Sequence, residues 1–212
     1  MKIIAASDLH GNLNTDMGFG DMLIIAGDIS PMIHFSMDEQ HDWFKRNFIP
    51  WLETLNFKYK VFILGNHDFF GKLYSSEVIN KELPPNCHYL FDQEVIIEGV
   101  KIYGTPWSPI FFNWAFMRSY SELEVLFSKI SNDTNILISH SPPEGILDLT
   151  WGQEHAGSLA LKRRISQLNM LKYNIFGHIH EGHGQIKNGN ITYVNASILD
   201  NGTNPIEINY EI

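Results

Sequence analysis

The chain has 212 residues, of which 44% are hydrophobic and 18% are charged. This composition is typical of one folded globular domain and excludes a largely disordered chain. The net charge of −9 argues against a protein that wraps nucleic acid along an extended basic face.

Cysteine use and the apolar runs bear on the compartment. Cys87 is the only cysteine, so no internal disulfide can form, which fits a reducing compartment. Residues 1–7 lack the basic start, the long apolar stretch and the cleavage site of a signal peptide. Since no apolar run approaches the roughly 20 residues that span a bilayer, we expect a cytoplasmic protein without membrane contact.

Short apolar runs alternate with helical patterns in chain order. Strands buried on both faces are predicted at residues 3–7, 22–26, 61–64, 136–139 and 173–176. Between the second and third of these strands, Ser36 and Glu39 match a capping box, and apolar residues follow at helical spacing. Pro50 is expected to kink or interrupt that helix.

Later segments complete the predicted fold. Ser119 and Glu122 match a second capping box, and the apolar spacing of residues 161–168 predicts a third helix. Asn188-Gly189 is typical of a hairpin turn between two late strands. Together these patterns predict an α/β fold, a sandwich of two mixed β-sheets flanked by helices, in one domain over residues 1–212.

Residues with metal-binding side chains follow each of the five predicted strands. They are Asp8 and His10, then Asp28, then Asn66, His67 and Asp68, then His140, and finally His178 and His180. Because the carboxyl ends of strands in an open α/β sheet line one crevice, we expect the five groups to converge. Each group alone is typical of turn or surface residues, whereas all of them together predict a metal site.

The residue types indicate which metals the site would bind. Carboxylate, imidazole and carboxamide ligands suit Mn²⁺, Fe²⁺ or Zn²⁺, and the lack of thiolates excludes a structural zinc site of the cysteine type. So many candidate ligands are too many for one ion and fit two ions that share a carboxylate. Such a pair is suited to in-line displacement at phosphorus.

The five groups resemble the ordered motifs of the calcineurin-like metallophosphoesterases. They read Asp8-Leu9-His10, Gly27-Asp28, Gly65-Asn66-His67-Asp68, Ser139-His140 and Gly177-His178-Ile179-His180. Their order and approximate spacing match, and no motif residue is missing, which favours an active enzyme over an inactive copy.

This resemblance implies a binuclear centre with seven protein ligands. The first ion would be bound by Asp8, His10 and His180. The second ion would be bound by Asn66, His140 and His178. Asp28 would bridge the two ions, together with a hydroxide that is the nucleophile. Mn²⁺ is the ion we expect first, with iron, zinc and nickel as alternatives.

The resemblance also implies two residues that act without binding metal. His67 would face the substrate, stabilise the transition state and protonate the leaving oxygen. Asp68 would lie behind His67 and orient it. A role of His67 as a further metal ligand stays open.

A narrower resemblance covers the second half of the chain. The segments that carry it include Gly104-Thr105-Pro106-Trp107, residues 140–143, residues 177–184 and Val194-Asn195-Ala196-Ser197. They are similar to the small metallophosphoesterase-domain proteins known from animal brain and from bacteria. That family hydrolyses phosphodiesters, including cyclic nucleotides, so the resemblance implies a phosphodiesterase that acts on a cyclic or small nucleotide.

Aromatic residues and further histidines have no motif of their own. The aromatic set is Trp107, Phe111, Phe112, Trp114 and Phe116. It is interpreted either as a stacking platform for a nucleobase or as a loop packed by its own rings or against another subunit, with Trp107 as the residue expected at the site. The surface, or a position behind the metal ligands, is expected for His34, His41, His88, His155 and His183.

Three other functions stay open at this point. They are a phosphomonoesterase, including a protein phosphatase, a nuclease of the same superfamily, and a non-catalytic nucleotide-binding scaffold. The acidic balance disfavours the nuclease, and the complete motif set disfavours the scaffold. The expected partner is a small-molecule phosphoester without an extended nucleic-acid surface, and a homo-oligomer stays open.

Overall fold

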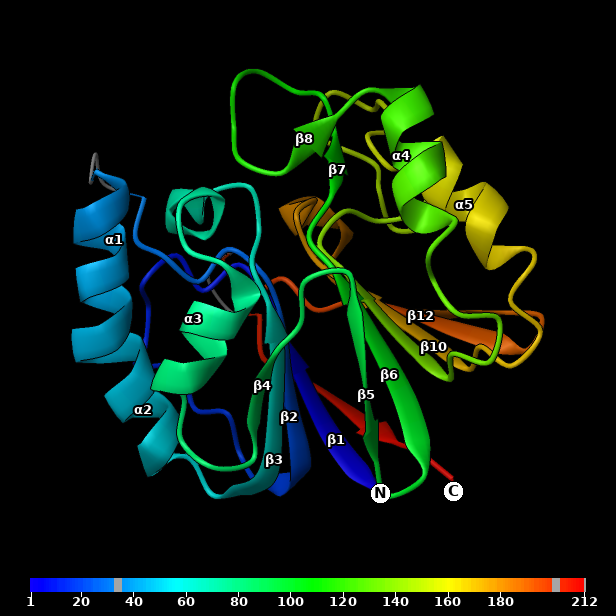
Figure 1. Ribbon diagram of the computed structural model, residues 1–212. Helices are drawn as coiled ribbons and strands as arrows, with labels where there is room; N and C mark the ends of the chain where they lie inside the picture. The colour runs from blue at the N-terminus through cyan, green and yellow to red at the C-terminus, as the bar shows by residue number, and fades with distance from the viewer. Residues whose placement is uncertain (33–35, 200–202, 212) are drawn as a thin grey trace.

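A computed structural model describes residues 1–32, 36–199 and 203–211 and shows two β-sheets packed face to face with helices outside them (Figure 1). The first sheet has the order β13 (Ile206–Asn209), β1 (Lys2–Ala6), β2 (Gly20–Ala26), β3 (Phe57–Ile63) and β4 (Cys87–Tyr89). The second has the order β11 (Gly184–Asn188), β12 (Ile191–Asn195), β10 (Tyr173–Phe176), β9 (Ile136–Ser139), β6 (Val100–Thr105) and β5 (Gln93–Ile97).

Both sheets are mixed, as the sequence predicts. Strands β1 to β4 run parallel, and β13 joins the edge of that sheet in the antiparallel direction. Strands β12, β10, β9 and β6 are also parallel, and the antiparallel strands β11 and β5 lie at the two edges. A short parallel pair, β7 (Ser108–Pro109) and β8 (Met117–Arg118), stands apart from both sheets.

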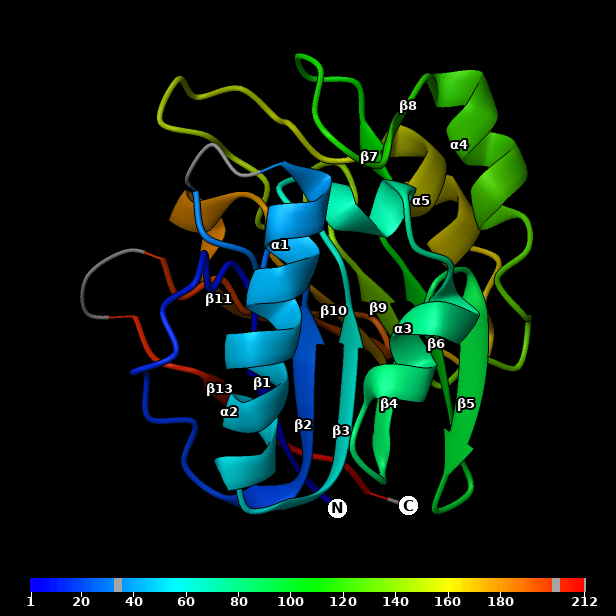
Figure 2. The ribbon, with the colours of Figure 1, turned by 60° about the vertical axis from the view of Figure 1, so that its left-hand side comes forward.

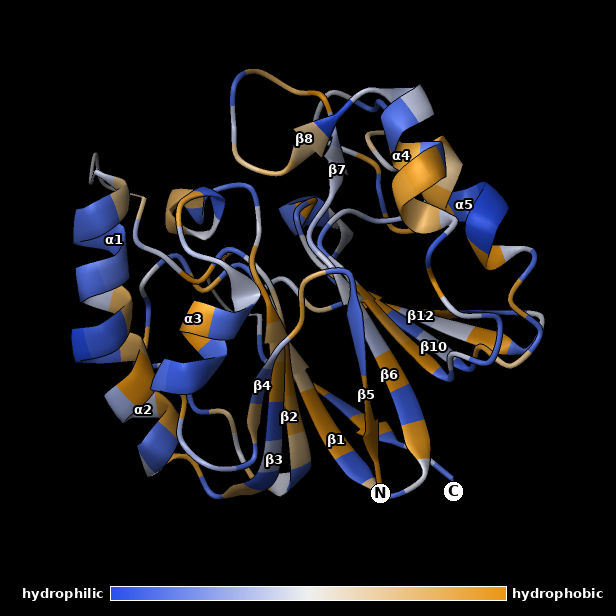
Figure 3. Cartoon of the chain, viewed as in Figure 1, coloured by the Kyte–Doolittle hydropathy of each residue, from blue (hydrophilic) through white to orange (hydrophobic). Residues whose placement is uncertain are grey.

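The side chains of the buried strands point alternately to the two faces of each sheet, and they divide the core into two layers. Ile3 and Ala5 of β1 point into the apolar layer between the sheets, whereas Ile4 and Ala6 point into the layer under the helices. Because side chains of a strand alternate between faces, a strand covered on both sides must be apolar throughout. Figure 3 shows this as orange along most of β1 and β2.

Helices cover the outer faces of the two sheets. Outside the first sheet lie α1 (Met37–Trp43), the π-helical turn η1 (Phe44–Phe48), α2 (Ile49–Thr54), the 3-10 turn η2 (Phe69–Lys72) and α3 (Ser76–Glu82). The second sheet carries α4 (Tyr120–Phe127) and α5 (Leu159–Ile165) (Figure 2). Both capping boxes expected from the sequence are present, at Ser36 with Glu39 and at Ser119 with Glu122.

Pro50 does not break its helix. It occupies the first turn of α2, directly after the π-helical turn η1. Proline is tolerated in the first turn of a helix, and a π-helical turn locally changes the hydrogen-bond pattern before it. The expected hairpin at Asn188-Gly189 joins β11 to β12. Within the described ranges, no helix is long and apolar enough to cross a bilayer.

Candidate metal centre

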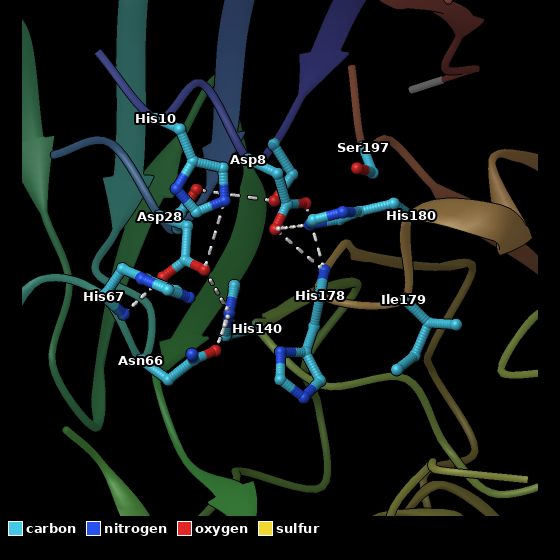
Figure 4. Close-up of polar contacts among 12 residues, drawn as sticks. Asp8, His10, Asp28, Asn66, His67, His140, His178, Ile179, His180 and Ser197 are labelled. Carbon is cyan, nitrogen blue, oxygen red and sulfur yellow. Dashed lines mark hydrogen bonds and ion pairs between the residues drawn. The ribbon is translucent and has the colours of Figure 1, made fainter. Parts of the chain in front are cut away.

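The predicted ligands converge where the carboxyl ends of strands from both sheets meet (Figure 4). Asp8 follows β1, Asp28 follows β2 and Asn66 follows β3, all in the first sheet. His140 follows β9 and His178 follows β10, both in the second sheet. The centre therefore exists only because the two sheets pack against each other.

Backbone hydrogen bonds between the strand ends hold the loops of the centre together. The Asp8 amide donates to the Gly27 carbonyl at 3.0 Å, and the His10 amide donates to the Asp28 carbonyl at 2.9 Å. The predicted ligands Asp8, His10, Asp28 and His178 all have positive φ, between 43° and 69°. Such backbone conformations are costly for residues other than glycine and cluster at functional sites.

The side chains form three overlapping groups whose ligand atoms lie within 4.8 Å of one another. The groups are Asp8 with His10 and His180, Asp28 with His10 and His67, and Asp8 with Asp28 and His140. Asp8, His10 and Asp28 each belong to two groups, as expected for a site that holds more than one ion. The presence of His67 in one group keeps its role as a ligand open.

Asp28 is the carboxylate that faces most of the other side chains. One of its oxygens, Oδ1, accepts a hydrogen bond from the His67 amide at 2.7 Å. The other oxygen, Oδ2, lies 3.4 Å from Nε2 of His140 and 3.7 Å from Nε2 of His10. Burial alone would raise the pKa of Asp28, but the surrounding histidines, His140 foremost, hold it far below the usual range.

His140 is oriented by hydrogen bonds from both ring nitrogens. Its Nδ1 lies 2.9 Å from the Ala26 carbonyl, which can only accept, so Nδ1 carries a proton. Its Nε2 lies 2.8 Å from Oδ1 of Asn66. With this orientation of the Asn66 amide, two acceptors would face each other unless a proton or a metal cation lies between them.

The same conflict is visible in the protonation of His140. Burial would lower its pKa, but the charge of Asp28 and the contact with it raise the pKa to about 9. The surroundings of Nε2 thus favour positive charge, which a proton supplies in the protein alone. A divalent ion bound by Asp28, Asn66 and Nε2 would supply the same charge.

His10 completes the argument that these residues fit metal ions. Its imidazole is only 2% exposed, and neither ring nitrogen has a hydrogen-bond partner among the residues that the structure describes. Burial holds its pKa below the ordinary value, which keeps a lone pair free at neutral pH. A buried polar group without a partner is costly, and coordination of a metal would remove that cost.

His178 is the predicted ligand that the structure brings least close. Its ring centroid lies 5.0 Å from that of His140, and its backbone amide donates to Asp8, but it belongs to none of the three groups. Burial, and then the charge of His140, lower the pKa of His178 to about 4. Its imidazole is therefore neutral, as a ligand must be, and its place beside the second ion stays a prediction.

Three glycines leave no space for a side chain beside the ligands. A Cβ atom on Gly65 would lie 2.3 Å from Oδ1 of Asp28, and a Cβ on Gly177 would lie 2.1 Å from Oδ2 of Asp8. At Gly27, where φ is also +103°, a Cβ would lie 2.6 Å from Nδ1 of His140. The glycines before Asp28, Asn66 and His178 thus allow backbone from one strand end to approach the predicted ligands of another.

Asp68 has hydrogen-bond partners on the backbone of two neighbouring loops. It is fully buried, and its hydrogen bonds in the structure come from the backbone amides of Ile29, Ser30 and Gly65, at 2.8 to 3.2 Å. It therefore ties the loop after β2 to the loop after β3. Its expected role in orienting His67 stays a prediction, and the motif alone does not reveal these backbone partners.

The aromatic segment contributes a ring beside the centre. The Trp114 ring lies 4.3 Å from that of His67. Trp107 is 7% exposed, donates its indole N–H to Asp92 at 2.8 Å and packs edge-on against Phe116, and it lines one pocket together with Trp114. The expectation that Trp107 lines the substrate site stays a prediction.

The remaining histidines agree with a role outside the ligand set. His41 is buried and pairs with Glu82, and His155 pairs with Asp148. His183 contacts the Ser197 carbonyl through Nδ1, and His88 is half-buried. His34 lies outside the described residues.

Asn195 has a role that the sequence did not reveal. Its amide donates to the carbonyls of Leu147 and Ile179. It thereby fixes the turn between His178 and His180, although its position at a strand end carries no such signal.

Comparison with known proteins extends the motif resemblance to almost the whole chain. The profile of the calcineurin-like phosphoesterases matches residues 1–182. Metallophosphoesterase domain-containing protein 1 of Homo sapiens is 31% identical, with 97% of this chain and 68% of that protein covered, and the Mus musculus protein matches equally. A UPF0046 protein of Caenorhabditis elegans is 31% identical, with 95% of this chain and 71% of that protein covered.

A solved crystal structure shares the fold with a TM-score of 0.68 at 19% identity, over 92% of this chain and 89% of that one. The family profile spans all five ligand-bearing loops. The chain belongs to the calcineurin-like phosphoesterase family.

Proposed function

We propose that this protein is a phosphodiesterase that hydrolyses a cyclic or small nucleotide with two divalent metal ions. Members of its family are metal-dependent hydrolases of phosphoesters. The observation that carries the proposal is the buried set of carboxylates and imidazoles around Asp28, whose ligand atoms lie within 4.8 Å of one another. That set suits two adjacent cations and an in-line attack at phosphorus.

The surroundings of the centre support a diester over a monoester. Asp28 and His140 contact histidines, an asparagine and backbone groups, and no lysine or arginine is among those contacts in the described part of the chain. A phosphomonoester dianion carries one more negative charge than a diester, and such a substrate is commonly held by arginine or lysine. A diester needs less additional positive charge.

Each residue of the centre has a defined part in the proposed reaction. When bound, the ions polarise the phosphate and lower the pKa of the attacking water. Asp28 keeps the two ligand groups together, and the hydrogen bond to the Ala26 carbonyl directs Nε2 of His140 into the centre. His67 delivers a proton to the oxygen that leaves phosphorus, and Trp114 supports its ring.

A substrate panel tests the proposal on protein loaded with Mn²⁺. We expect bis-p-nitrophenyl phosphate and cyclic nucleotides to be cleaved faster than p-nitrophenyl phosphate. The reverse order would identify a phosphomonoesterase, and cleavage of DNA or RNA on a gel would identify a nuclease. Absence of any metal-dependent rate, with nucleotide binding retained, would identify a scaffold.

A further inference from the structure

Gln40 lies outside every motif and yet contacts the segment that carries His67. It sits in α1 and is only 4% exposed. Its side-chain Nε2 donates to the His67 carbonyl at 3.0 Å, and its Oε1 accepts from the Phe70 amide at 3.1 Å. The oxygen and the nitrogen of one buried side-chain amide thus both form hydrogen bonds to the backbone of residues 67–70.

The helix that carries Gln40 is itself held in place next to η2 (Figure 2). Its neighbour His41 pairs with Glu82 of α3 at 2.8 Å, and the His41 ring stacks on Tyr74 with a centroid distance of 3.8 Å. The hydroxyl of Tyr74 donates to Asp38 at 2.6 Å. Gln40 therefore projects from a fixed support.

His67 is consequently held from two sides of its backbone. Its amide donates to Oδ1 of Asp28 at 2.7 Å, and its carbonyl accepts from Gln40. Its ring lies between Trp114, at 4.3 Å, and His10, at 4.8 Å. If the Gln40 contact were lost, the carbonyl side of His67 would keep only the Phe69 amide as a partner, and the imidazole could shift relative to the ligands.

We propose that Gln40 is a positioning residue for proton delivery to the leaving group, because it holds the backbone of His67. This inference rests on the proposed function, in which His67 is the proton donor. A catalytic group displaced by about 1 Å can lose roughly 100-fold in rate. The effect should be largest where the leaving oxygen most needs a proton.

Two diesters separate this role from a merely structural one. Bis-p-nitrophenyl phosphate releases p-nitrophenolate, a weak base, whereas diphenyl phosphate releases the more basic phenolate. In Gln40→Met we expect cleavage of diphenyl phosphate to fall by about 10- to 100-fold and that of bis-p-nitrophenyl phosphate by less than about 3-fold. Metal content should be unchanged. Gln40→Asn keeps a buried amide but is too short to span both contacts, so it should show the same selectivity while folding more readily.

Asn80 provides a matched control. Its amide donates to the carbonyl of Tyr89 and accepts from the amide of Tyr89 in the same manner, at 2.9 and 3.0 Å, and neither residue belongs to the predicted ligand set. Asn80→Leu should lower the melting temperature without changing the ratio of the two rates. Equal losses on both diesters in the Gln40 variants would overturn the inference.

His67→Ala distinguishes failure of this inference from failure of the proposed function. If His67→Ala discriminates between the diesters and the Gln40 variants do not, only the role of Gln40 is wrong. If His67→Ala shows no discrimination while the wild type still prefers diesters in the substrate panel, then His67 is not the proton donor and the inference about Gln40 falls, whereas the proposed phosphodiesterase function stands.

Discussion

Asp28 touches three other residues of the centre through two carboxylate oxygens. It is almost fully buried, so its negative charge is stable only beside positive charge. The contacts of the Asp28 carboxylate therefore depend on its charge more than on its shape. Substitutions that keep the shape and change the charge are therefore the informative ones.

Asp28→Asn should abolish activity while the chain stays folded. The amide oxygen can still accept from the His67 amide, but the charge that two cations would share is gone. We expect turnover of bis-p-nitrophenyl phosphate to fall more than about 100-fold, with metal content, measured by elemental analysis, also reduced. Asp42→Asn, at an exposed carboxylate paired with Lys45, is the control and should change neither. Full metal content and full rate in Asp28→Asn would contradict the assignment.

His67→Ala should leave the metal content unchanged and lower the rate of cleavage of diphenyl phosphate by about 100-fold or more. The reason is that its proposed task is proton transfer, even though its ring nitrogen comes within 4.8 Å of ligand atoms from Asp28 and His10. Elemental analysis of the purified variant shows whether His67 is needed for metal binding. Loss of an ion would make His67 a ligand.

The loops that follow the strands are the elements that build the centre. In the loops after β2, β3 and β10, a glycine at position 27, 65 or 177 allows backbone and ligand side chains from different strand ends to lie close together. Asp68 then ties two of these loops together through three backbone amides. The loops behave as one unit, so a change in one should disturb ligands on another.

Gly65→Ala should damage the metal centre although Gly65 has no side chain that could bind a metal ion. Its new Cβ would lie 2.3 Å from Oδ1 of Asp28 and 2.6 Å from Cε1 of His140, so both must move. We expect a destabilisation of about 1–3 kcal/mol and loss of metal affinity by isothermal titration. In the control Gly152→Ala, the nearest atom lies at 3.6 Å, and both quantities should stay as in the wild type.

The two tryptophans in the segment between β6 and α4 are predicted to differ in their effects on turnover and on stability. Trp114→Ala removes the ring beside His67 and should slow turnover by up to about 10-fold, equivalent to roughly 1.4 kcal/mol. Trp107→Phe loses the hydrogen bond to Asp92 and should cost about 1 kcal/mol of stability without changing turnover. Kinetics and thermal unfolding of both variants test this. Slower turnover in Trp107→Phe, with turnover unchanged in Trp114→Ala, would instead place Trp107 beside the substrate.

At the scale of the molecule, metal ions should contribute to global stability. Buried Asp8 and Asp28 are held by histidines alone in the protein without metal. An ion present at 100 times its Kd adds about 2.7 kcal/mol. Chelation should therefore lower the melting temperature by roughly 5–10 °C. The Asp28→Asn protein should show a much smaller shift, and an equal shift would mean that the ions bind elsewhere.

The sequence predicts the scaffold well because buried strands and their polar ends have clear local signals. The polar residues that follow the predicted strands are enough to predict that one edge of the two sheets carries the metal site. They are Asp8, Asp28, Asn66, His140 and His178. The partners of Asp68, Trp107, Trp114 and Gln40 depend on which loops lie side by side, and no local pattern encodes that. The single-domain organisation, the cytoplasmic location, the oligomeric state and the identity of the metals stay predictions.

One of the three ligand groups joins Asp8 and His10 from the first strand end to His180 from the last. During synthesis on the ribosome, these residues are separated by most of the chain. A nascent chain therefore cannot complete this group until β10 has been made and has docked beside β9. We therefore expect capture of a full pair of ions to be a late event in biogenesis, which follows the synthesis of His180.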